Sequence, residues 1–139
     1  MMEELKKLLH DGGHSLVVEN DGIYTYDGRG VTDLFRLLNT APNVLRSARI
    51  ADKVVGKAAA ALMVMAKVGE VYADVVSRPA IELLERYGIR TTYGVLADRI
   101  INRSGMGMCP LETRCMACRT AEECLVQIRL FIEEMQKKH

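Results

Sequence analysis

The stretch EVYADVVSRPAIELLERYGIRTTYGVL, residues 70–96, decides the fold class of this 139-residue chain. Residues 70–77 are apolar on both faces of an extended segment, which is typical of a strand inside a covered parallel sheet. Ser77-Arg78-Pro79 then places a capping residue and a proline at the start of a helix, and Gly88 ends that helix. Residues 90–96 are predicted to form the next strand. The stretch therefore predicts a strand–helix–strand unit with parallel strands.

A long apolar segment precedes this unit. Residues 58–66 are apolar throughout and lie between two lysines, but the run is far shorter than the roughly 20 residues that a membrane span needs. We predict instead a buried helix that begins at Asp52, as its N-cap, and runs to about Lys67. From Asp52 onward the predicted order is helix, strand, helix, strand, which favours right-handed β-α-β crossovers.

The first 42 residues predict a helix, a hairpin and a second helix. Residues 2–10 carry leucines at helical spacing, and residues 33–39 do the same before Pro42 ends that helix. Between them, residues 14–19 and 23–26 are predicted strands, joined by the tight turn Asn20-Asp21-Gly22. The predicted fold class is α/β: a three-layer α-β-α arrangement with a mixed, mostly parallel sheet that an N-terminal β-hairpin opens.

The C-terminal part follows a glycine-rich loop at residues 102–107. A last helix begins at Thr120, where Thr120 and Glu123 fit a capping box. Its wide apolar stripe is expected to pack on the sheet, and an exposed portion leaves a homodimer open. We divide the chain into an α/β domain, residues 1–112, and a cysteine-rich connection with the final helix, residues 113–139, packed on the same domain.

The composition limits the classes of function. Hydrophobic residues make up 49% and charged residues 27%, and the net charge is +1, so there is no strong case for nucleic-acid binding. The first residues lack the apolar region of a secretory signal, so we expect a cytoplasmic protein that does not bind a membrane. Thiols stay reduced in that compartment, where clustered cysteines indicate metal or redox chemistry more than disulfides. His10, His14 and His139 are expected to be surface or structural residues.

Two predicted helix starts provide a candidate ligand site. Open parallel sheets bind ligands at the carboxyl ends of their strands, where helix N-termini meet. Residues 52–57 and 77–79 supply two such starts, with positive charge from Lys53, Lys57 and Arg78. We therefore expect a small anionic or nucleotide-like ligand there. Lys57 is the sharpest candidate, because a lysine inside a buried helix needs a partner. The alternative, compatible with the first, is that Asp52 and Ser77 only cap their helices.

Two motifs resemble a known family. ADKVVGKAAA, residues 51–60, and CPLE, residues 109–112, resemble an uncharacterised prokaryotic family, domain of unknown function 1893, with a cytidine-deaminase-like fold. The resemblance covers about residues 5–112. It implies a deaminase-like pocket, whose lining would be Asp52, Lys53, Lys57, Ser77, Arg78, Cys109 and Glu112.

The zinc-ligand motifs of the deaminases are missing. In zinc deaminases the first helix carries a His or Cys ligand and, two residues later, a Glu, whereas the second carries Pro-Cys-x-x-Cys. Here Asp52-Lys53-Val54 offers no such arrangement. Pro79 is followed by Ala80, and Leu83 stands at the position of the second cysteine. The resemblance therefore implies ligand binding without zinc-dependent deaminase activity, and whether the protein is an enzyme stays open.

All four cysteines lie near the C-terminus, with the spacing Cys109-x5-Cys115-x2-Cys118-x5-Cys124. Four thiolates are a complete ligand set for zinc or an iron–sulfur cluster, although this spacing is neither that of a zinc ribbon nor that of a bacterial ferredoxin. The alternative function is therefore a metal or iron–sulfur protein that uses these four residues. A redox dithiol at Cys115 and Cys118, and simple reduced cysteines in a connecting loop, are further readings.

Cys109 and Glu112 also belong to the CPLE motif. One hypothesis makes Cys109 a nucleophile near Lys57, with Glu112 as base or orienting group, since a nearby cation stabilises a thiolate. The other makes the motif a Cys-Pro turn in which Glu112 caps a helix or pairs with a lysine. The sequence assigns neither residue a catalytic role.

Overall fold

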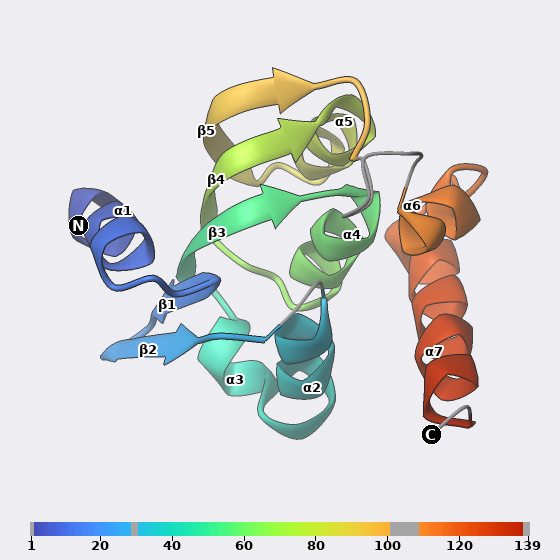
Figure 1. Cartoon of the computed structure of the whole chain (residues 1–139), viewed down its shortest axis with the longest axis horizontal. Helices are drawn as coiled ribbons and strands as arrows, with labels where there is room; N and C mark the ends of the chain where they lie inside the picture. Colours follow the sequence, from blue (N-terminus) through green and yellow to red (C-terminus); the bar gives the residue numbers. More distant parts are fainter. Residues whose placement is uncertain (1, 29–30, 101–108, 138–139) are drawn as a thin grey trace.

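The computed structural model describes residues 2–28, 31–100 and 109–137 and contains a five-stranded sheet in the order β2-β1-β3-β4-β5 (Figure 1). β1 pairs antiparallel with both β2 and β3, whereas β3, β4 and β5 are parallel. The predicted mixed sheet with an N-terminal hairpin is therefore confirmed. The strands are β1 (Leu16–Glu19), β2 (Ile23–Tyr26), β3 (Arg49–Val55), β4 (Glu70–Ser77) and β5 (Arg90–Ala97).

Helices cover both faces of the sheet (Figure 1). α1 packs on one face, against β1 and β3, and α4 and α5 pack on the other. α7 packs on α4 and α6, so the expectation that the last helix packs on the sheet is wrong: α4 already covers that face. The helices are α1 (Met2–Asp11), α2 (Thr32–Thr40), α3 (Pro42–Leu45), α4 (Lys57–Met65), α5 (Arg78–Arg86), α6 (Pro110–Cys115) and α7 (Ala121–Lys137).

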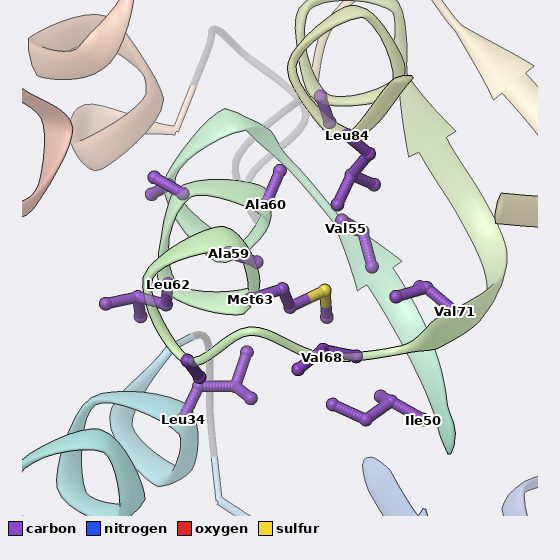
Figure 2. Close-up of a cluster of buried hydrophobic side chains, with 14 of the residues drawn as sticks. Leu34, Ile50, Val55, Ala59, Ala60, Leu62, Met63, Val68, Val71 and Leu84 are labelled. Carbon is purple, nitrogen blue, oxygen red and sulfur yellow. The ribbon is translucent and has the colours of Figure 1, made fainter. Parts of the chain in front are cut away.

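The core lies mainly between the sheet and α4. α4 is alanine-rich and buried along most of its length, which lets it approach the strands closely. Met63 extends from α4 toward Ile50 of β3 and Val71 of β4 (Figure 2). A smaller cluster on the opposite face joins Leu5 and Leu9 of α1 to the sheet. Aliphatic side chains and methionine thus fill the interior of a chain that has no tryptophan.

The expected helix from Asp52 is wrong in its first five residues. Residues 49–55 form β3, and α4 begins only at Lys57, with Gly56 as its N-cap. Asp52 instead lies opposite Leu16 of β1 and Ala73 of β4. The physical reason is non-local: two neighbouring strands satisfy the backbone of β3, and that pairing outweighs the local preference of an aspartate for a cap. Pro42 likewise begins α3 as well as following α2.

Other local predictions are confirmed. Ser77 caps α5 and accepts the Ala80 N–H at 3.2 Å. Thr120 accepts the Glu123 N–H at 3.1 Å, although the Glu123 carboxylate reaches back to the N–H of Arg119 rather than to that of Thr120. The expected glycine-rich loop at 102–107 lies outside the described residues. The expected domain boundary at residue 112 lies inside α6.

Among the described helices, none combines the length and the apolar character that crossing a bilayer requires.

Candidate functional site

A cavity of about 440 Å³, called the main cavity below, opens near the carboxyl end of β3, next to the start of α4. It brings together four of the residues predicted for a ligand site: Asp52 and Lys53 from β3, and Cys109 and Glu112 from the chain around α6. The rest of the described lining comes from the segments that flank the hairpin, from the connection between β3 and α4, and from single residues of three further segments: Gly13, Ser15, Leu16, Asp27, Gly28, Val31, Asp33, Leu34, Val54, Gly56, Ala59, Ile100 and Leu111. Apolar wall comes from Leu16, Val31, Leu34, Ala59, Ile100 and Leu111.

Glu112 connects the wall of this cavity to the start of α4. Its side chain is nearly inaccessible, with 8% exposure, and its carboxylate accepts the backbone N–H groups of Lys57 at 2.8 Å and Ala58 at 3.1 Å. These are two of the otherwise unpaired N–H groups at the start of α4, where the helix dipole also favours a negative charge. Glu112 therefore caps α4, as one of the two hypotheses for CPLE expects.

Gly56 makes this contact possible. A Cβ atom at residue 56 would overlap with Oε1 of Glu112. The backbone there is extended, with φ −93°, so the requirement for glycine is steric and not conformational. Gly56 and Glu112 are thus a matched pair, and they connect the 51–60 motif to the 109–112 motif.

Asp52 is the most perturbed acid of the site. Burial raises the pKa of its half-buried carboxyl to about 8, against the opposing effect of hydrogen bonds from the backbone of Lys53 and Val54. Among the described residues no cation forms an ion pair with it. The carboxyl is therefore mostly protonated at neutral pH, where it can donate a hydrogen bond or a proton into the cavity.

Two further acids line the cavity and were missed by the sequence reasoning. Asp33 accepts the Gly28 N–H at 2.8 Å and pairs with Arg36 at 3.1 Å. Asp27 pairs with Nδ1 of His14 at 2.8 Å, so this histidine, expected to be surface or structural, borders the site through its partner. The position of Asp27-Gly28 directly after the hairpin was the available signal, since the hairpin carries that segment to the carboxyl end of β3.

Three predicted site residues lie elsewhere. Nζ of Lys57 donates to the Met116 carbonyl at 3.2 Å and to the Cys118 carbonyl, so this side chain holds the segment between α6 and α7. Lys57 and Ser77 border a second cavity of about 330 Å³, which Glu112 also reaches. Arg78 is exposed and pairs with Asp98 at 2.7 Å. The structure therefore does not bring all seven predicted residues to one cavity.

Oxygen atoms of the chain itself occupy donors at the start of both helices. The Lys57 and Ala58 N–H groups at the start of α4 bind Glu112, and the Ala80 N–H of α5 binds Ser77. These three N–H groups are therefore not open to an anionic ligand in this structure.

Cys109 and the other three cysteines lie in different parts of the structure. Cys109 lines the main cavity, whereas Cys115, Cys118 and Cys124 interact with one another where α6 is joined to α7. All four are free thiols. Within the described ranges, no group of three or more His, Cys, Asp or Glu residues has an arrangement that could hold a metal ion. The four-cysteine metal or iron–sulfur site is therefore not supported.

The fold and cavity define an α/β protein with a mixed five-stranded sheet and an acid-lined pocket beside its central helix. The family model described as "Domain of unknown function (DUF1893)", TM1506, matches residues 4–132, and this chain therefore belongs to the DUF1893 family. It resembles the crystal structure of a DUF1893 family protein (TM1506) from Thermotoga maritima, with a TM-score of 0.85 and 25% sequence identity over 96% of this chain and 88% of the other. No curated protein matches this chain.

Proposed function

We propose that the main cavity binds a small neutral or cationic ligand, of the class of amino-substituted nitrogen heterocycles such as nucleobases and nucleosides. The observation that carries this proposal is the position of Asp52: a half-buried carboxyl at the cavity, with its pKa raised by burial and with no ion-pair partner among the described residues. Buried or half-buried ionisable groups of this kind concentrate at binding and catalytic sites.

The charge of the lining supports a ligand without phosphate. Among the residues that the structure describes, the carboxyl groups of Asp27, Asp33, Asp52 and Glu112 border the cavity, and Lys53 is the one lysine or arginine in its lining. A phosphate or carboxylate would meet the carboxylates of Asp27, Asp33 and Glu112, whereas an amino group or ring N–H would find acceptors. This revises the anionic ligand that the sequence led us to expect and keeps the nucleotide-like part of it.

The shape of the lining supports a flat ring. Leu16, Leu34 and Leu111 provide apolar surface for the faces of a heterocycle, and polar groups around them can read its edge. The protonated Asp52 donates to a ring nitrogen or carbonyl oxygen, and the carbonyl of its acid group accepts from an adjacent amino group. Such paired recognition at one edge is well suited to nucleobases.

We further infer that the fold is cytidine-deaminase-like and that the site works without deaminase zinc chemistry. The sheet order and a pocket at the start of α4 support the resemblance. The observed helices begin Lys57-Ala58-Ala59 and Arg78-Pro79-Ala80, and neither carries the ligand residues that the deaminase motifs require. Cys109 stays a candidate for contact with the ligand, and no catalytic residue is assigned.

Calorimetric titration of the folded protein tests the proposal. Cytosine, adenosine and inorganic phosphate serve as probes, with Asp52→Ala as the site variant and Asp98→Ala, at an exposed position away from the main cavity, as its matched control. We expect at least one of the two heterocyclic probes to bind, and Asp52→Ala to weaken it by about tenfold or more. Binding of phosphate alone, binding by neither heterocycle, or equal binding by Asp52→Ala would overturn the proposal.

A further inference from the structure

We propose that Asp27, oriented by His14, determines the specificity of the main cavity: it selects heterocycles with an amino group over those with an oxo group at the same position. This role of Asp27 rests on the proposed function, to which it adds the residue that tells the two ligand classes apart. It follows from the hydrogen bonds that the carboxyl groups of the described lining already make.

The protonated Asp52 cannot make this distinction by itself. A protonated carboxyl presents one O–H donor beside one carbonyl acceptor. It therefore matches a ligand edge on which an amino group stands beside a bare ring nitrogen, as in cytosine. It matches equally well an edge on which an oxo group stands beside a ring N–H, as in uracil. Telling the two apart requires a group that can only accept hydrogen bonds, which is an ionised carboxylate.

Two of the carboxylates in the lining already use both of their oxygens. Oδ2 of Asp33 accepts the Gly28 N–H, and Oδ1 accepts from Arg36. The two oxygens of Glu112 both accept backbone N–H groups at the start of α4. In the part of the chain that the structure describes, Asp27 has a partner only at Oδ1. Its Oδ2 is therefore the carboxylate oxygen that the fold leaves for the amino group of a ligand.

His14 fixes the orientation of the Asp27 carboxylate. Nδ1 of the imidazole donates to Oδ1 of Asp27 at 2.8 Å. The neighbouring residues hold the two segments together, because the N–H and the hydroxyl of Ser15 both donate to the Tyr26 carbonyl at 3.0 Å. A Cβ atom at residue 12 would overlap with Cδ2 of His14, so Gly12 gives the ring its room. The Asp27 side chain is thus held in place although it is 71% exposed.

Asp27→Asn turns the acceptor into a donor. The side-chain oxygen of the asparagine is expected to keep the hydrogen bond from His14, because Nδ1–H needs an acceptor. The amide NH2 group then takes the place of Oδ2 and offers N–H groups to the ligand. The preference is therefore expected to pass from the amino to the oxo compound.

Calorimetric titration of the folded protein measures this preference with two pairs of probes, cytosine against uracil and adenosine against inosine. For at least one pair, we expect the wild type to bind the amino compound about tenfold more tightly or better. Asp27→Asn is expected to bind the oxo compound at least as tightly as the amino compound. The measured quantity is the ratio of two affinities on the same folded variant, so a general loss of stability does not imitate it.

Two further variants serve as controls. Asp21→Asn makes the same change in the exposed turn at the other end of the hairpin, and it is expected to keep the ratio of the wild type. Addition of His14→Phe to Asp27→Asn removes the donor that orients the amide. Because either end of the amide can then face the ligand, we expect the double variant to show no preference.

The outcomes separate this role of Asp27 from the proposed function. Equal binding of the two members of each pair by the wild type would overturn the role of Asp27 and leave the proposed function standing. An amino preference that persists in Asp27→Asn would do the same and would assign the distinction to another group. Binding of neither cytosine nor adenosine would overturn the proposed function and the role of Asp27 with it.

Discussion

Glu112 occupies the place at the start of α4 where many α/β proteins hold an anionic ligand. The residue that precedes α4 has to be small for this to happen, and Gly56 is the residue found there. The Glu112 carboxylate fills the space that Gly56 leaves free. This contact connects two motifs that lie about 55 positions apart in the sequence. Because Glu112 occupies this place, the N–H groups of Lys57 and Ala58 are not open to an anionic ligand.

Substitution of Gly56 tests this pairing. Gly56→Ala is expected to lower the free energy of unfolding by about 1–3 kcal/mol, because its Cβ displaces the Glu112 carboxyl. In a Glu112→Ala background the same change is expected to be neutral or slightly stabilising, since φ at this position suits alanine. Urea denaturation of the two single variants and the double variant measures the coupling. Additive effects would show that the two residues do not meet.

The raised pKa of Asp52 predicts how the stability of the fold depends on pH. Its folded-state pKa, about 8, is above the ordinary value of 3.8, so the folded chain binds a proton that the unfolded chain has released between these values. Stability from this residue is therefore lost as pH rises across that range. Asp52→Asn removes the titration, so the variant should gain about 1–3 kcal/mol relative to the wild type between pH 5 and pH 7.

Urea denaturation of both proteins at several pH values gives this difference directly. Because the other titrating groups are common to the two chains, their contributions cancel in the comparison. Parallel stability curves for the wild type and Asp52→Asn would mean that the carboxyl titrates normally and is ionised at neutral pH.

At the scale of elements, Lys57 joins α4 to the C-terminal part of the chain. Its backbone N–H holds Glu112 of α6, and its ammonium group holds two carbonyls in the connection to α7. Lys57→Met keeps the backbone contact and removes the second set. We expect it to lower the free energy of unfolding by about 1–3 kcal/mol, because hydrogen bonds from a charged donor are lost.

Hydrogen exchange locates the effect of Lys57→Met. Faster exchange is expected at Cys118 and Cys124, whose N–H groups bond to backbone carbonyls within this segment, with little change in α1. Lys7→Met, at an exposed position of α1, is the matched control. Equal protection in Lys57→Met and in the control would contradict the role assigned to Lys57.

The same elements show what the sequence can predict. The bounds of β2 and β4 and the cap of α5 follow from local signals: alternation, a continuous apolar strand, and Ser77 before Pro79. The helical expectation for residues 52–55 is wrong because their strand state depends on pairing with β1 and β4, which a local pattern does not contain. Lys57 was correctly expected to need a partner, but its partners are carbonyls about 60 residues away.

At the scale of the molecule, the fold forms the cavity by bringing together segments that are distant in the sequence. The hairpin, the end of β3, the start of α4 and α6 meet there. Asp27 and Asp33 thus join four of the seven residues that the sequence suggested, namely Asp52, Lys53, Cys109 and Glu112. The sequence showed no acidic cluster because these carboxyls are dispersed along the chain. The negative charge of the cavity lining, on which the proposed ligand class depends, is therefore evident only in the folded chain.

A homodimer formed through the exposed face of α7 stays a prediction. α7 exposes Val126, Leu130 and Met135 although its other face packs on α4 and α6. A homodimer through this helix would give twice the monomer mass in light scattering, and Leu130→Glu should return it to the monomer. The cytoplasmic location likewise stays a prediction.

The central claim is that the cavity bordered by Asp52 and Glu112 is the ligand site. Nuclear magnetic resonance of the ¹⁵N-labelled protein, titrated with cytosine and with adenosine, tests it most directly. With at least one of these probes, we expect chemical-shift changes centred on Gly28, Val54, Gly56 and Leu111, and their loss in Asp52→Ala. Changes centred instead on Ser77 and Asp98 at the second cavity, or no changes with either probe, would contradict it.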